Sequence, residues 1–116
     1  MKPRQRLEFD REIELGRELL TRGDEEGAFG HLERAHVIGQ TFVGTHAKTH
    51  WLMFKLELRR RRFSAVSGQA ARLVLGIIGS AVGVVPIGNT GGTDISMFKR
   101  LPIPPDLKEI IDGHAN

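Results

Sequence analysis

Apolar side chains recur along most of the chain at the spacing of an α-helix. Phe9, Ile13, Gly16 and Leu20 fall on one stripe, and similar stripes follow further along. The pattern predicts four main helices and a short fifth, over residues 9–22, 25–38, 43–61, 64–82 and 106–112. We therefore expect an all-α fold, and a chain of 116 residues is long enough for one hydrophobic core, so residues 1–116 are taken as a single helical domain.

Helix ends and turns have local signals. Gly23 is suited to a left-handed stop, Asp24 to an N-cap and Ser64 to the N-cap of the fourth helix. The short turn at residues 40–42 predicts that the second and third helices are antiparallel neighbours. The expected inner face of the third helix consists of Val43, Ala47, His50, Trp51, Phe54 and Leu58.

The stretch Leu73–Ile87 is the most apolar part of the chain. It spans 15 residues and contains three glycines and a proline, whereas a membrane helix needs about 20 apolar residues. We interpret it as part of a buried core helix, and we expect no integral membrane insertion.

A long irregular segment follows at residues 84–105 and is expected to be an ordered covering loop. Its Gly88–Thr93 run lacks the Lys-Ser/Thr of a nucleotide-binding loop, so a turn with positive φ is the favoured interpretation. If this loop folds back over the histidines described below, Asn89, Thr90 and Asp94 line a pocket there.

Charge and composition limit the classes of functional site that the chain can contain. The chain has no cysteine, which excludes disulfides, thiolate metal sites and thiol nucleophiles. The formal net charge is +3, and much of the excess is the run Arg59, Arg60, Arg61 and Arg62, a candidate anion or nucleic-acid patch. No nucleic-acid-binding motif accompanies it, so we expect a solvated helix end. The first residues lack the apolar segment of a signal peptide, and we expect a cytoplasmic setting.

Four of the five histidines lie within residues 31–50. His46 and His50 are i,i+4 neighbours on one helix face, a spacing that lets two imidazoles share a metal ion. Glu33 and His36 form a Glu-x-x-His step of the kind found in helical carboxylate metal sites. Folding the two helices antiparallel sets His36 opposite His46 and His31 opposite His50.

His31 and His36 are about 140 degrees apart on a helical wheel and cannot both face one ion. We therefore predict His36, His46 and His50 as metal ligands, with Glu33 or His31 as the fourth. Nitrogen and oxygen ligands suit zinc, nickel, copper(II) or iron(II), and uptake is expected to weaken below about pH 6 as imidazoles protonate. The alternative is that the histidines are structural and bond to backbone carbonyls.

Two resemblances accompany these patterns. Residues 9–39 resemble a tetratricopeptide-type helical hairpin, on the packing positions Leu15, Gly16, Leu19, Gly23, Ala28, Leu32 and Ala35. The whole chain resembles a family of small uncharacterised bacterial proteins, a domain of unknown function. That resemblance is carried by the runs HLERAH (31–36), GNTGG (88–92) and LPIPPDL (101–107), with the histidine pair before Trp51 and the arginine-rich helix end. It implies a bacterial, cytoplasmic protein and no mechanism.

We conclude from the sequence that the protein is a small binding protein with a histidine-rich transition-metal site between the second and third helices. The alternative is a helical adaptor or homo-oligomerisation module, bound to a protein partner or a second copy. No serine-nucleophile motif is present, and we do not expect an enzyme. An enzyme using these histidines would need an open coordination position and a pocket beside it.

Overall fold

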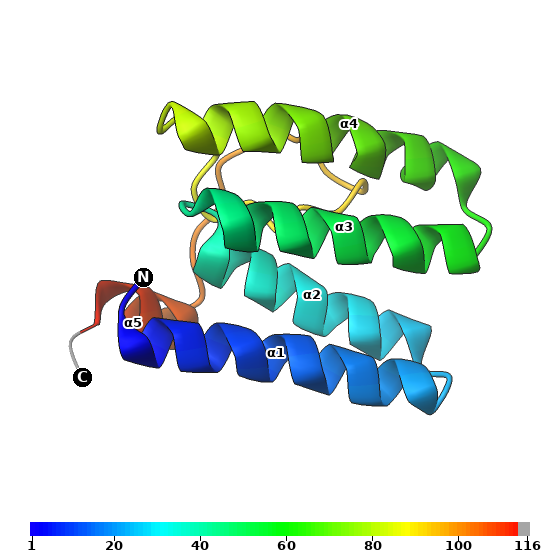
Figure 1. The fold of residues 1–116 in the computed structure, drawn as a ribbon, viewed down its shortest axis with the longest axis horizontal. Helices are drawn as coiled ribbons and strands as arrows, with labels where there is room; N and C mark the ends of the chain where they lie inside the picture. Colours follow the sequence, from blue (N-terminus) through cyan, green and yellow to red (C-terminus); the bar gives the residue numbers. More distant parts are fainter. Residues whose placement is uncertain (114–116) are drawn as a thin grey trace.

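Figure 1 shows the computed structural model, which describes residues 1–113. Its five helices are α1 (Pro3–Thr21), α2 (Glu25–Gly39), α3 (Val43–Arg59), α4 (Phe63–Ala81) and α5 (Pro105–Asp112). The described residues contain no strand, so the all-α prediction is confirmed.

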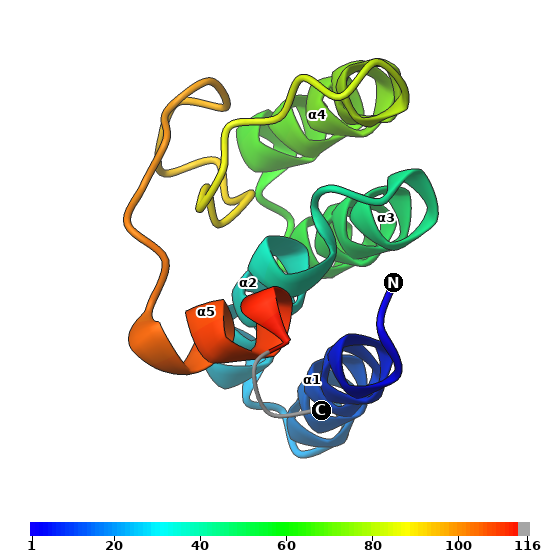
Figure 2. The same cartoon turned by 90° about the vertical axis from the view of Figure 1, so that its left-hand side faces the viewer.

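Consecutive helices run antiparallel and pack side by side, α1 on α2, α2 on α3 and α3 on α4 (Figure 1). Helix α5 packs against α1 and α2 (Figure 2). Helix α4 therefore lies at the edge of the molecule, with α3 as its only helical neighbour among the described residues. The likeness of the α1–α2 hairpin to a tetratricopeptide repeat stays a prediction.

The hydrophobic core lies among α1, α2, α3 and α5. Its buried members are Phe9, Ile13, Ala28, Leu32, Ala35, Val37, Ile38, Met53, Leu56, Leu107 and Ile110. None of these residues comes from α4, although α4 is the most apolar helix in the sequence. Burial of apolar side chains thus holds the other four helices together, whereas α4 contributes none of the buried residues of this core.

Two predicted boundaries are wrong by two residues or more. Helix α1 begins at Pro3, six residues before the expected start, because proline is favoured in the first turn and Gln5 is anchored by a hydrogen bond from its Nε2 to Ile38 O (2.8 Å). Helix α3 ends at Arg59 rather than at residue 61, since Arg61 adopts a left-handed conformation (φ 58°).

The expected inner face of α3 is also wrong in part. Trp51 and Leu58 are 49% and 48% exposed, and Val43 is exposed as well. His50 is buried as expected, but the rest of the buried face includes the polar side chains of Thr45, His46, Thr49 and Glu57. The error has a physical cause. Helix α3 packs between α2 and α4, and the face that it turns toward α4 is polar, so the positions of apolar residues could not identify that face as buried.

The prediction that α4 is a buried core helix is wrong. Only Ala65, Gln69 and Ser80 of α4 are buried, and Val74 is 59% exposed. Ser64 is not its N-cap, because the helix begins one residue earlier. By length and composition alone α4 could cross a membrane, and 17% of that segment is buried within the protein.

The segment between α4 and α5 folds back beside α2 and α4 as an ordered loop (Figure 2). The amide of Gln40 anchors this loop through two hydrogen bonds: Oε1 accepts from the Gly88 N–H (2.8 Å), and Nε2 donates to Pro86 O (3.0 Å). Gly88 and Gly91 have φ of 82° and 85°, so the predicted positive-φ turn is confirmed. This loop completes the surroundings of the histidines.

Candidate metal centre

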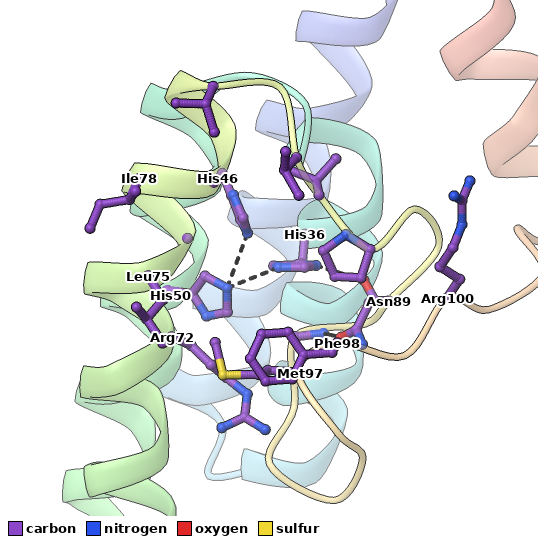
Figure 3. Close-up of a pocket in the computed structure, with 17 residues that line it drawn as sticks. His36, His46, His50, Arg72, Leu75, Ile78, Asn89, Met97, Phe98 and Arg100 are labelled. Atoms are coloured by element: carbon purple, nitrogen blue, oxygen red, sulfur yellow. Dashed lines mark hydrogen bonds between the residues drawn. The ribbon is translucent and has the colours of Figure 1, made fainter.

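Three imidazole rings meet where α2, α3, α4 and the following loop come together (Figure 3). The Nε2 atom of His50 lies 3.0 Å from that of His36 and 3.2 Å from that of His46. The rings are 2–4% exposed. One nitrogen from each ring therefore points at a common centre inside the protein.

The other ring nitrogen of each histidine has a partner of its own. His36 Nδ1 lies 2.7 Å from Asn89 O, a backbone carbonyl in the loop. His50 Nδ1 lies 2.8 Å from Gln69 Oε1, and His46 Nδ1 lies 2.5 Å from Ser80 Oγ, both on α4. Each ring is thus oriented by a different residue outside its own helix.

These partners assign the protons. The Asn89 carbonyl can only accept, so His36 Nδ1 carries the hydrogen. Gln69 donates its Nε2 hydrogen to Gly91 O (2.9 Å), which leaves Oε1 as the acceptor for His50. Ser80 Oγ lies 2.5 Å from His46 Nδ1 and 3.3 Å from Gln40 O; when its hydroxyl donates to Gln40 O, it accepts from His46 Nδ1. With Ser80 in that orientation, all three neutral rings are Nδ1–H tautomers, and the three Nε2 lone pairs face one another.

Three facing lone pairs repel unless a cation lies among them. Burial and the neighbouring histidines lower the pKa of His36 well below its usual 6.5 and that of His46 to about 4. Burial also lowers the pKa of His50, although its bond to Gln69 partly opposes this. At neutral pH the cluster consequently holds no extra proton, and its vacant lone pairs suit a metal ion.

The spacing also fits a metal. Two nitrogens on one tetrahedral zinc, each about 2.0–2.1 Å from it, lie roughly 3.3 Å apart, close to the 3.0 and 3.2 Å of the two nitrogen pairs that include His50. The donors of His36, His46 and His50 all lie within 4.8 Å of one another, and no further histidine, aspartate or glutamate of the described chain belongs to this group. The residues present would hold an ion by three neutral nitrogens and leave a position for another ligand.

The structure does not bring the two candidate fourth ligands to this centre. His31 faces α1, where its Nδ1 lies 2.5 Å from Glu12 Oε2. Glu33 lies in a different pocket, near Thr90 and Asp94; burial raises the pKa of its carboxyl, and a hydrogen bond from Thr90 partly offsets this. Because α2 turns about 100 degrees per residue, only His36 among its acidic and histidine residues reaches the centre.

The three loop residues have separate positions. Asn89 is fully buried and holds the loop, since its Nδ2 donates to Ser96 O (2.9 Å) and Lys99 O (2.7 Å) and its Oδ1 accepts from the Gly91 N–H. Its backbone carbonyl orients His36. Thr90 and Asp94 lie on the side of Glu33 rather than beside the rings. The expected return of the loop over the histidines is therefore confirmed for Asn89.

The four arginines at the C-terminal end of α3, Arg59 to Arg62, make different contacts. Arg60 and Arg62 both pair with the buried carboxylate of Glu57 (3.1 and 3.4 Å), and Arg59 pairs with Glu25 (3.6 Å). Arg61 has the left-handed backbone conformation at the end of the helix. Three of the four charges are thus engaged within the protein, which weakens the case for an anion or nucleic-acid patch.

Sequence reasoning missed the residues that orient the rings. Gln69 and Ser80 are polar side chains at buried positions of a helix whose apolar residues are largely exposed. Gly76 and Gly91 leave room for the imidazoles: a Cβ on Gly76 would lie 3.1 Å from His46 Cε1, and one on Gly91 would lie 2.6 Å from His36 Cδ2. The sequence shows that these segments are rich in glycine, but it does not show which side chains the glycines contact.

Comparison with known proteins places the chain in a family. Residues 3–111 match the family described as "Protein of unknown function (DUF3703)", so the chain belongs to that family. No curated protein and no solved structure matches it significantly. The family description names no activity, and functional inference must come from the site itself.

Proposed function

We propose that the protein binds one transition-metal ion through the Nε2 atoms of His36, His46 and His50. The observation that carries this proposal is the orientation of the three rings: each Nδ1 is committed to a protein acceptor, and each Nε2 lone pair faces the same buried point. Metal-binding histidines in proteins characteristically donate their second nitrogen in this way, which fixes the tautomer and orients the ring.

The proposed role is that of a binding protein, in sensing, buffering or delivery of the ion. Three imidazoles without a thiolate suit zinc, copper(II), nickel or iron(II). The ion would join α2 and α3 and, through Gln69 and Ser80, secure α4, which shares no apolar core with the other helices. Metal binding should therefore stabilise the folded protein by an amount that rises with the logarithm of the free metal concentration once that concentration exceeds the dissociation constant.

The test is calorimetric titration with zinc, nickel and copper(II), together with elemental analysis of the loaded protein. We expect one ion per chain for the wild type and at least a hundredfold weaker binding for His50→Ala. His31→Gln is the matched control, because His31 lies on the same helix as His36 but contacts Glu12 instead. Equal binding by wild type and His50→Ala would overturn the proposal.

The alternative is an adaptor or oligomerisation module in which the histidines only pack. The exposed apolar residues of α4, including Val74, Ile77 and Ile78, favour it. Size-exclusion chromatography with and without a chelator separates the two functions, since assembly through α4 should be insensitive to chelation.

A further inference from the structure

The histidines form part of the wall of a cavity of about 610 Å³, bounded by α4 and the loop (Figure 3). Its volume is in the range of sites for small organic ligands. Apart from the rings and two arginines, the wall is largely apolar, with Leu75, Val82, Val85, Met97 and Phe98 among its members. The metal position and an apolar chamber are thus adjacent.

The charged side chains that line this cavity are all cationic. Its charged lining residues are Arg72 and Arg100, and no aspartate or glutamate of the described chain lines it. The carboxylates of Glu33 and Asp94 line another pocket, with Arg60 and Arg62. Asp94 interacts electrostatically with Arg72, but a divalent ion on three neutral imidazoles would add two further positive charges with no aspartate or glutamate of the described chain beside the rings.

Arg72 has an unused donor. Its Nη1 and Nη2 donate to Gly68 O (3.1 Å) and Ile95 O (3.0 Å), but its Nε is buried without a hydrogen-bond partner in the described chain. A buried donor left unsatisfied is unfavourable by about 1–3 kcal/mol. An anion that enters the cavity beside the metal would find both a vacant coordination position and a cationic wall.

We infer that the cavity binds a small amphipathic carboxylate, whose carboxylate coordinates the metal as its fourth ligand and whose hydrocarbon tail occupies the apolar chamber. This inference rests on the proposed metal site and specifies what that site binds. The ion supplies the attachment point, and the apolar wall selects for the tail. A hydrophilic anion such as acetate gains only the first of these contributions.

The test uses protein loaded with one equivalent of zinc and titrated with acetate, butyrate, hexanoate and octanoate. Each methylene that enters the chamber should tighten binding about fourfold, from the usual transfer free energy of a buried CH₂. Protein without metal should bind octanoate at least tenfold more weakly. Equal affinity along the series, or equal octanoate binding with and without zinc, would overturn the inference.

Two variants test whether the hydrocarbon tail of the carboxylate occupies the apolar chamber. Leu75→Trp fills part of the chamber and should reduce the gain per methylene, whereas Val74→Trp alters the neighbouring residue of α4, which does not line the cavity. Zinc uptake by each variant reports that the site is intact. Failure of the wild type to take up zinc, nickel or copper(II) would refute the proposed function itself, whereas metal uptake without chain-length dependence would refute only the carboxylate site.

Discussion

Gln69 and His50 are joined by a hydrogen bond of 2.8 Å, from His50 Nδ1 to Gln69 Oε1, inside the interface between α3 and α4, and α4 contributes no residue to the hydrophobic core cluster. The Gln69 amide is itself fixed by donation to Gly91 O. One buried side chain thus determines the tautomer of a candidate ligand and ties α4 to both α3 and the loop.

Replacing this amide should weaken the metal site. Gln69→Leu removes the acceptor for His50 Nδ1 and should lower metal affinity roughly 10–100-fold, the usual effect of losing such an orienting partner. Affinity is measured by competition with a chromophoric chelator. Gln5→Leu is the control, since Gln5 is equally buried but bonds to Ile38 O, away from the rings. Unchanged affinity in Gln69→Leu would contradict the assigned role.

The metal-free protein should lose stability in acid. The three cluster histidines have lowered native pKa values, about 4 for His46, so below pH 6.5 the unfolded chain binds protons that the native protein excludes. The free energy of unfolding should be greatest above pH 6.5 and fall toward pH 4 by about 1.4 kcal/mol per pH unit for each such histidine.

Urea titrations between pH 7.5 and 4.5 measure this slope, and His46→Gln should make it shallower. A flat profile for the wild type would show that the rings are not buried as neutral groups. The lowered pKa values also change the expectation for metal uptake, whose loss should begin further into acid than the pH 6 suggested by ordinary histidines.

Gly91 should tolerate no side chain. Its φ of 85° and the 2.6 Å separation between an added Cβ and His36 Cδ2 predict that Gly91→Ala destabilises the protein by about 2 kcal/mol or more and displaces His36. Gly30→Ala is the opposite case: Gly30 lies inside α2 with open space beside it, so the change should stabilise by about 0.5–1 kcal/mol. Thermal unfolding of both variants checks the pair; a stable, metal-binding Gly91→Ala would contradict the packing described.

Arg61 allows a test of the backbone strain at the end of α3. It adopts φ 58°, which is unfavourable for a residue with a Cβ, so Arg61→Gly should stabilise the protein by about 1 kcal/mol. Arg59→Gly, in the last turn of α3, should destabilise by a similar amount. Denaturant unfolding distinguishes the two; a destabilised Arg61→Gly would mean that the Arg61 side chain makes a contact worth more than the backbone strain.

Much of the architecture is encoded locally. The period of apolar residues in α1 and α2, the capping Asp24, which accepts from the Gly27 N–H (2.9 Å), and the turn after Gly39 were enough to predict the helices and their antiparallel order. The meeting of His36 and His46 across α2 and α3 followed from the same register. The predicted pairing of His31 with His50 is wrong, because His31 faces Glu12 on α1 and His50 meets His36 instead. Position on a helix and the length of a turn are properties of the nearby sequence, and the fold class depends on little else.

Tertiary packing decided the rest. Whether an apolar helix is covered depends on what lies beside it, so the burial of α4 could not be inferred from its composition. The orienting contacts of the rings join residues 19 to 53 positions apart, as in His50–Gln69 and His36–Asn89. Sequence alone therefore predicted which imidazoles could meet, whereas only the folded chain determined that their lone pairs face one point, because the proton on each ring is fixed by a partner from α4 or the loop.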